Sequence, residues 1–368
     1  MKIGFDYPIF TLQHTGGVSR YFVRLVEQLL SLGEEVEVYA PLLINHYVAQ
    51  LPRAVVRGWP VPFLPQKTAR LLDVVNRCLT PLMAGNRRYD LVHETYYTTT
   101  PVMTNASARV TTIHDMIPER FPHFFSSRSR IWQRKQAAIQ RADHIICVSQ
   151  QTKMDLCDVY AVEPARITVI YLGVDTQWAA GASTAVQERP FLLYVGRRGR
   201  YKNFRGLLEA VARSRALRRE LAVIAFGGGR FTAEERQLIR RLGLSEQQIK
   251  QVSGDDALLA RYYRSATALV YPSLYEGFGL PPLEAMQNDC PVVVSQRGAI
   301  PEIVGAAGEY FDPEDPEDMA RGIGRVVFDS RRRAELIAAG RERVAQFSWR
   351  RCAEQTRAVY QQVCQQKG

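Results

Sequence analysis

The sequence predicts an α/β protein with two doubly wound domains, each a parallel sheet covered by helices on both faces. Short apolar runs alternate with amphipathic stretches along the whole chain of 368 residues, which is the pattern typical of such a fold. The pattern stops at a small, polar stretch and starts again near Phe191. The length also fits two domains of ordinary size.

The first half of the chain contains the elements of one such domain. Apolar residues recur at helical spacing from Val18 to Leu30, and Gly33 ends that helix, as glycine commonly does. Apolar runs predict strands at Lys2–Phe5, Glu35–Ala40, Asp90–His93, Val110–Ile113, His144–Val148 and Ile167–Tyr171.

The second half repeats the pattern. Its first run is continuously apolar, which is typical of a strand buried on both faces. Strands are predicted at Phe191–Val195, Leu221–Phe226, Ala268–Tyr271 and Val292–Ser295, and a helix over Phe204–Ala216. We place the first domain at residues 1–177, a linker at 178–187, the second domain at 188–348 and a final amphipathic helix within 349–368. Ligands of such sheets bind outside the carboxyl ends of the strands, so chemistry is expected in the loops that follow them.

Composition narrows the class of protein. Charged residues make up 23% of the chain, and the formal net charge is +11. A basic surface favours phosphate, carried by a nucleotide, a nucleic acid or an anionic lipid, although it also serves solubility. The six cysteines form no C-x-x-C pair, and the sequence shows neither a signal peptide nor an apolar run long enough to span a membrane. We expect a cytoplasmic protein, at most at the inner face of a membrane.

The most informative segment, Tyr271–Met286, places a glycine-containing loop between a predicted strand and a predicted helix. Gly277 and Gly279 lie in this loop, and the backbone N–H groups at the start of a helix suit a phosphate. Glu276 and Glu284 bracket the segment with the spacing E-x7-E. Carboxylates there accept charge-assisted hydrogen bonds from sugar or ribose hydroxyls. A structural turn would also explain the glycine loop taken alone.

A second motif follows the first strand of the second half. Gly196 and Arg197 come directly after the strand, and Lys202 lies further along the same loop. Two cations at a strand end form a clamp for a diphosphate, Arg through its planar guanidinium and Lys as a point charge. For Arg198 and Arg200 in the same loop, we favour solvent-facing charges over contacts with an acidic substrate.

A third motif lies in the first half. His114 and Asp115 directly follow the strand that ends at Ile113. A lone histidine is more often structural than functional. Asp115 would either orient the histidine ring or cap the segment that follows.

Together the three motifs resemble those of the large retaining glycosyltransferase family four, whose members adopt the GT-B fold of two Rossmann-like domains facing each other across a cleft. The resemblance runs from Gly16 to Glu284 and covers essentially the whole chain. It implies that the final helix crosses back onto the first domain.

The resemblance also implies roles for individual residues. Glu276 would hold hydroxyls of the donor sugar, and Glu284 the ribose of the nucleotide. Arg197 and Lys202 would stabilise the charge of the leaving diphosphate in place of a metal. His114 would contact the donor sugar, supported by Asp115. The other implied donor-binding positions are Gly16, Gly17, Gly196, Gly277, Phe278, Gly279 and Leu280.

By the same resemblance we expect transfer of a hexose from a nucleotide-sugar with retention at the anomeric carbon, without a cofactor or metal. The sequence contains no D-x-D tripeptide and no His/Cys/Asp cluster with the spacing of metal ligands. The stretch from His114 to Glu119 resembles transferases that build bacterial polysaccharides. GDP-mannose is therefore the first candidate donor, and a glycan or lipid-linked glycan the candidate acceptor.

The segment Lys67–Leu82 carries an apolar stripe next to basic residues. A basic amphipathic segment can lie on an anionic membrane, but we favour packing of this stripe on the core of the first domain. The stripe consists of Leu71, Val74, Val75, Cys78, Leu79 and Leu82, beside Lys67, Arg70 and Arg77.

Other functions stay open: an epimerase or phosphorylase on the same fold, a nucleic-acid or anionic-surface binder, and an inactive sugar-binding protein. The basic residues are spread over both halves instead of being gathered on one groove-reading element, so we expect no nucleic-acid partner.

Overall fold

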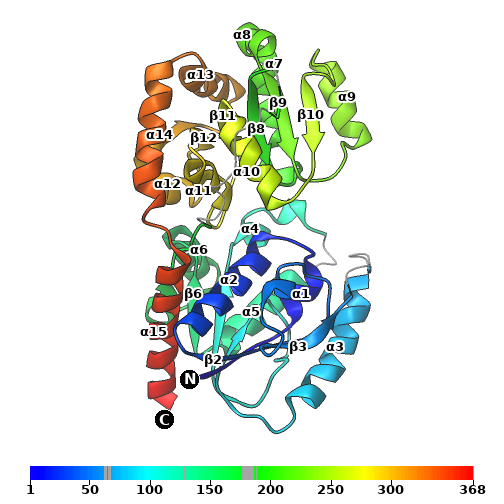
Figure 1. Cartoon of the computed structure of the whole chain (residues 1–368), viewed down its shortest axis with the longest axis vertical. Coiled ribbons are helices and arrows are strands. Elements are labelled where there is room, and N and C mark those ends of the chain that lie inside the picture. Colours follow the sequence, from blue (N-terminus) through cyan, green and yellow to red (C-terminus); the bar gives the residue numbers. More distant parts are fainter. Residues whose placement is uncertain (62–63, 65–67, 127–129, 176–185, 188, 368) are drawn as a thin grey trace. The chain divides into compact units, whose positions relative to one another are not determined.

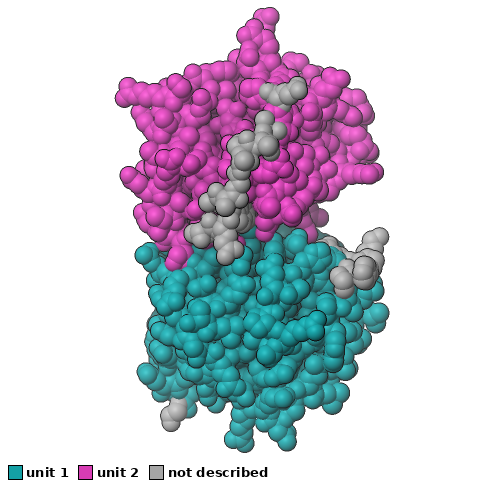
Figure 2. Space-filling model, in the orientation of Figure 1, with its two compact units in different colours: residues 1–173, 349–368 teal, residues 174–348 magenta. Residues whose placement is uncertain are grey.

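The computed structural model describes residues 1–61, 64, 68–126, 130–175, 186–187 and 189–367. The chain forms two compact units, coloured separately in Figure 2. The first unit comprises residues 1–173 and 349–368, and the second comprises residues 174–348. Most of the expected linker, residues 178–187, lies outside the described residues.

The first unit contains a seven-stranded parallel sheet with helices packed against it (Figure 1). The strand order is β3-β2-β1-β4-β5-β6-β7. The strands are β1 (Lys2–Phe5), β2 (Glu35–Leu43), β3 (Val56–Pro60), β4 (Tyr89–Glu94), β5 (Ala106–Ile113), β6 (His144–Cys147) and β7 (Ile167–Val169). Its α-helices are α1 (Pro8–Leu12), α2 (Gly17–Ser31), α3 (Ala69–Ala84), α4 (Ile117–Arg120), α5 (Ile131–Arg141), α6 (Gln150–Tyr160) and α15 (Trp349–Lys367).

Helix α15 is drawn in red in Figure 1 and packs within this unit on α2 and β5. A buried polar network reinforces the apolar contacts. His93 of β4 hydrogen-bonds through Nδ1 to the hydroxyl of Tyr360 on α15 (2.5 Å) and through Nε2 to the hydroxyl of Thr112 on β5 (2.8 Å). Burial lowers the pKa of His93 to about 3, so a neutral imidazole joins the last helix to the centre of the sheet.

The second unit contains a six-stranded parallel sheet in the order β10-β9-β8-β11-β12-β13. Its strands are β8 (Phe191–Val195), β9 (Ala222–Phe226), β10 (Ile249–Val252), β11 (Ala268–Tyr271), β12 (Val292–Ser295) and β13 (Gly308–Phe311). Its α-helices are α7 (Phe204–Arg213), α8 (Arg215–Glu220), α9 (Ala233–Arg241), α10 (Asp256–Ser265), α11 (Leu280–Gln287), α12 (Ile300–Val304), α13 (Pro316–Val327) and α14 (Ser330–Val344). The prediction of two α/β domains with parallel sheets is therefore confirmed.

One helix prediction is wrong, and three strands were missed. The helix expected over Phe204–Ala216 ends at Arg213, because the hydroxyl of Ser214 accepts a hydrogen bond from the N–H of Leu217 (3.3 Å) and caps a new helix, α8. The strands β3, β10 and β13 were not predicted at all. No described helix is long and apolar enough to cross a membrane.

The apolar stripe of α3 does not pack on the core as expected. Leu71, Val74, Cys78 and Leu82 are exposed, whereas Val75 and Leu79 of the same stripe are half-buried. Leu72 and Asn76, outside the stripe, are buried. The prediction failed because the buried side of this helix is largely polar or small. Lys67 and the side chain of Arg70, which were expected beside the stripe, lie outside the described residues.

A buried ion pair supports the loop after β5. Lys135 of α5 lies 2.8 Å from a carboxylate oxygen of Glu119 on α4, and its ammonium also donates to the backbone carbonyl of Asp115 (2.9 Å). The ammonium stands 5.3 Å from the centre of the Tyr97 ring. The hydroxyl of Tyr160 donates to the second oxygen of Glu119 (2.9 Å). Each charged or polar group of this network therefore has a partner within the network.

Removing the lysine alone should destabilise the first unit. The variant Lys135→Met leaves Glu119 as an unpaired buried charge, which costs about 3–5 kcal/mol. The double variant Lys135→Met/Glu119→Gln removes both charges and keeps an acceptor for Tyr160, so it should recover much of the loss. Urea unfolding, followed by fluorescence, measures the free energy of unfolding of the single and the double variant. Equal stability of the single and double variants would contradict the role of this pair.

Candidate functional site

Two loops meet at the carboxyl edge of the second sheet, after the neighbouring strands β8 and β11. The ammonium of Lys202 lies 2.6 Å from Oε1 of Glu276 and 3.5 Å from the hydroxyl of Tyr271. The backbone joins the same loops, since the N–H of Leu274 donates to the carbonyl of Tyr201 (2.7 Å). The structure therefore brings together two of the predicted residues, a cation and a carboxylate.

Backbone conformation explains the glycines of these loops. Gly196, directly after β8, has φ of +116°, and Gly279, which caps α11, has φ of +107°. Residues that carry a side chain rarely adopt such a positive φ, so glycine is required at both turns. Next to the loop, the N–H of Ala299 donates to the carbonyl of Glu276 (3.2 Å) and holds the carboxylate-bearing residue in place.

The N-terminus of α11 lies at this loop. Gly277, Phe278 and Gly279 precede the helix, and Leu280 is its first residue. The first N–H groups of a helix are not used by its own hydrogen bonds, and the positive end of the helix dipole lies there. Glu284 is buried on the same helix, where Oε2 accepts a hydrogen bond from the hydroxyl of Tyr263 (3.0 Å).

The arginines of the β8 loop differ from one another. Arg197 is exposed, and the carbonyl of the same residue accepts a hydrogen bond from Tyr194. Arg198 is only 7% exposed and pairs with Glu235 of α9 at 2.9 Å, and it also donates to the carbonyl of Gly227 (2.8 Å). The expectation of a solvent-facing charge is therefore wrong for Arg198, because its partners lie on α9 and in the loop after β9. Arg200 is exposed, as expected.

In the first unit, His114 follows β5 and is buried. Burial and the nearby charge of Lys135 lower its pKa to about 3. The backbone N–H donates to the hydroxyl of Tyr97 (3.4 Å), and the ring stands 5.2 Å from that of Tyr21. Among the residues that the structure describes, Nε2 of His114 has no hydrogen-bond partner. A buried neutral imidazole with an unused nitrogen can accept from or donate to a ligand.

The other predicted residues of the first unit, Asp115, Gly16 and Gly17, shape the backbone around them. Asp115 accepts a hydrogen bond from the N–H of Ile117 (3.0 Å) and so caps the segment that follows, one of the two expected roles. Gly16 precedes α2 with an extended backbone, and Gly17 is the first residue of the helix. A side chain at Gly16 would collide with that of Gln13, whose amide oxygen accepts from the N–H of Ser19 (3.2 Å).

Several residues that support the site were not predicted from the sequence. Tyr271 contacts Lys202, and Tyr263 donates a hydrogen bond to Glu284. Lys135 and Tyr97 hydrogen-bond to backbone atoms of the loop that contains His114. Tyr271 ends a predicted strand, and its position before the motif was the available signal. The other three lie far from the motifs in the sequence, so only the fold reveals them.

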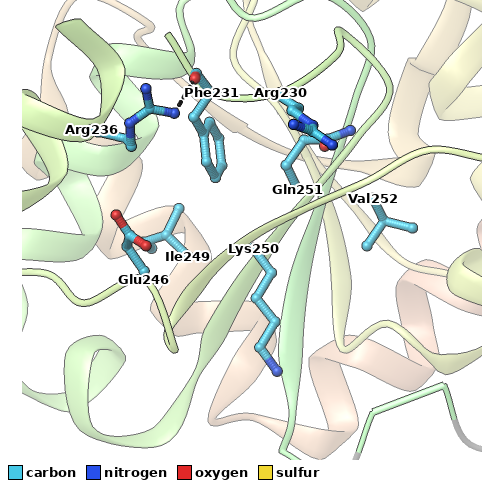
Figure 3. Close-up of a pocket in the computed structure, with 8 residues that line it drawn as sticks. All are labelled: Arg230, Phe231, Arg236, Glu246, Ile249, Lys250, Gln251 and Val252. Atoms are coloured by element: carbon cyan, nitrogen blue, oxygen red, sulfur yellow. Dashed lines mark hydrogen bonds between the residues drawn. The ribbon is translucent and has the colours of Figure 1, made fainter. Parts of the chain in front are cut away.

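A shallow cavity of about 410 Å³ lies at the outer strand β10 of the second unit (Figure 3). Arg236 donates to the carbonyl of Phe231 (2.6 Å) at its margin. None of the predicted site residues lines it. The lining residues are Arg230, Phe231, Arg236, Glu246, Ile249, Lys250, Gln251 and Val252.

Two family models match the chain. The model of "Glycosyltransferase Family 4" matches residues 15–178, and that of "Glycosyl transferases group 1" matches residues 179–343. Among curated proteins, an MMP alpha-(1->4)-mannosyltransferase of Mycolicibacterium hassiacum is 28% identical over 95% of each chain. The O-antigen chain mannosyltransferase B of Escherichia coli is also 28% identical, over 94% of this chain and 95% of the relative.

Solved structures agree with the predicted fold. The sucrose-phosphate synthase of Thermosynechococcus elongatus superposes with a TM-score of 0.76, at 23% identity over 98% of both chains. Anabaena Alr3699/HepE, solved in complex with UDP and glucose, gives a TM-score of 0.73 at 19% identity, over 98% of this chain and 99% of that one. The fold is GT-B. Since the two family models together match residues 15–343, the chain belongs to the family 4, group 1 glycosyltransferases.

Proposed function

We propose that this glycosyltransferase transfers a hexose from a nucleotide-sugar with retention at the anomeric carbon and without a metal. The observation that carries the proposal is the Lys202–Glu276 pair at the edge of the second sheet (2.6 Å). A cation there can stabilise charge on a departing diphosphate, and a carboxylate can accept hydrogen bonds from sugar hydroxyls.

The proposed roles follow the positions of the groups. The diphosphate binds Lys202, Arg197 and the amides of Gly279 and Leu280 at the start of α11, where the helix dipole also favours negative charge. The carboxylate of Glu284 accepts hydrogen bonds from the ribose hydroxyls. From the first unit, His114 offers Nε2 to the donor sugar, because this atom has no partner among the described residues.

In the proposed reaction, the bond between the anomeric carbon and the diphosphate oxygen breaks while the acceptor oxygen attacks from the same face. The acceptor's proton passes to the departing diphosphate, so no protein base is needed. The protein contributes positioning and fixed charge. The neutral imidazole of His114 fits this scheme, since a cation beside a developing positive charge on the sugar would oppose it.

The donor and acceptor are proposed from the relatives. Two curated relatives are mannosyltransferases, one of them acting on O-antigen chains by its name. GDP-mannose is therefore the first candidate donor, and a glycan or lipid-linked glycan the candidate acceptor. The structural neighbour that binds UDP and glucose makes UDP-glucose the second candidate donor.

Thermal unfolding with a panel of nucleotide-sugars tests the donor. GDP-mannose, UDP-glucose, ADP-glucose and dTDP-glucose are each compared with and without EDTA. A ligand at 100 times its dissociation constant adds about 2.7 kcal/mol of stability, so one nucleotide class should raise the melting temperature, and EDTA should not change the shift.

The variant Glu284→Ala should abolish this shift in melting temperature. Glu309→Gln is the control, because this buried carboxylate of β13 pairs with Arg325 and Arg332 instead. No response to any donor, or a response lost in EDTA, would contradict the proposal.

Replacing the cation should slow the reaction itself. Lys202→Met should lower kcat about 10²–10³-fold, the effect of removing one group that stabilises transition-state charge. Arg205→Met is a matched control, since Arg205 lies three residues further on and forms an exposed pair with Glu209 (2.7 Å). Steady-state kinetics compares kcat of the two variants, and only Lys202→Met should lower it. A Lys202→Met enzyme with unchanged kcat would show that this ammonium does not act on the leaving group.

A further inference from the structure

One buried hydroxyl contacts the backbone of both cationic residues in the β8 loop, residues 196–203. Tyr194 lies on β8 and is 1% exposed. Its hydroxyl donates to the carbonyl of Arg197 and, in a longer three-centre contact, to the carbonyl of Lys202 (3.4 Å). Burial, and next to it the charge of Glu276, raises the pKa of this hydroxyl well above its ordinary value, so the group stays a donor. A single side chain therefore links the two ends of the loop.

The backbone of the β8 loop depends on contacts from outside it. Gly196, Arg200 and Asn203 have positive φ angles of +116°, +59° and +53°. Residues that carry a side chain are uncommon in this region, and they persist there where their surroundings hold them. Such backbone also tends to occur at functional sites.

Other contacts hold the β8 loop at different residues. Arg198 pairs with Glu235 (2.9 Å), and the carbonyl of Tyr201 accepts a hydrogen bond from the N–H of Leu274 (2.7 Å). These contacts fix the middle of the loop. The hydroxyl of Tyr194 acts on the two cationic residues themselves.

The backbone position of these two residues decides where their charges lie. Arginine and lysine carry their charges on long side chains, so a cation is well placed only if its backbone is fixed and its side chain is supported. The ammonium of Lys202 is supported by Glu276 (2.6 Å) and stands 5.4 Å from the ring centre of Tyr201. Arg197 is exposed, so its guanidinium depends more on the backbone that carries it.

We propose that Tyr194 is a positioning residue for the diphosphate of the donor. Its hydroxyl holds the backbone of Arg197 and Lys202 so that both cations meet the same diphosphate. This inference rests on the proposed function, because it takes these two residues as the ligands of the diphosphate. Tyr194 acts through them and not on the substrate itself.

The affinities for a nucleoside diphosphate and for the matching monophosphate test the proposal. Isothermal titration calorimetry compares GDP with GMP, and UDP with UMP. Tyr194→Phe removes the hydroxyl and keeps the ring, which packs 4.9 Å from the ring of Phe204. This variant should bind the diphosphate about tenfold more weakly, the effect of one buried hydrogen bond. Its affinity for the monophosphate should stay nearly unchanged, because a single phosphate does not need two cations at a fixed separation.

Tyr310→Phe is the matched control. Tyr310 lies on β13 of the same unit, and its hydroxyl also donates to a backbone carbonyl, that of Gly305 (2.6 Å). The control loses the same kind of hydrogen bond and should bind both nucleotides as the wild type does.

Hydrogen exchange of the loop, followed by mass spectrometry, gives a second readout. The N–H groups of Lys202 and Asn203 donate to the carbonyls of Gly199 and Arg200 (3.2 and 3.1 Å). In Tyr194→Phe these two amides should exchange faster than in the wild type, and bound diphosphate should slow them again. Exchange at the wild-type rate would overturn the proposal.

Lys202→Met distinguishes a failure of this inference from a failure of the proposed function. The positioning role is overturned if Lys202→Met weakens diphosphate binding and Tyr194→Phe does not. It is also overturned if Tyr194→Phe weakens the binding of diphosphate and monophosphate equally, since that is general damage to the site. If Lys202→Met binds the diphosphate as the wild type does, the proposed function fails, and the inference fails with it.

Discussion

The ion pair between Lys202 and Glu276 is the contact on which the second unit's site depends. Adjacent parallel strands bring the two loops together, and the Leu274–Tyr201 backbone hydrogen bond fixes their separation. Both side chains are largely removed from water, so each needs the other's charge or that of a ligand. An arriving donor can meet this need, with its diphosphate at the lysine and its hydroxyls at the glutamate. The pair is therefore the place where we propose that the negatively charged sugar nucleotide binds.

The fold was predictable where strands are buried on both faces. Phe191–Val195, Ala268–Tyr271 and Val292–Ser295 lie where they were predicted, because a central parallel strand must be apolar throughout. The three missed strands lie at sheet edges: Val56–Pro60, Ile249–Val252 and Gly308–Phe311. An edge strand needs only one hydrogen-bonded neighbour and tolerates residues such as Lys250 and Pro60. Its sequence therefore resembles that of a loop.

Parts of the candidate site were predictable for a different reason. Glycine is needed at Gly196 and Gly279 by the backbone, and helix starts bind anions, so local sequence indicates the loops. Local sequence does not reveal the partner of a charge. Local sequence predicts a surface position for Arg198, because its partner Glu235 lies 37 residues away. On α3, spacing identified the apolar stripe, but the choice of inner face depended on the hydrogen bonds of Asn76 with Leu42.

The anomeric configuration of the product tests the central claim most directly. The nucleotide-sugar that stabilises the fold is incubated with a simple glycoside acceptor, and NMR of the product gives the configuration of the new linkage. Transfer from GDP-α-mannose should give an α-linked mannoside, since the diphosphate leaves and the acceptor attacks on the same face. A β-linked product would contradict the same-face reaction, and the absence of transfer from every nucleotide-sugar would contradict the assignment of Lys202 and Glu276 to the donor.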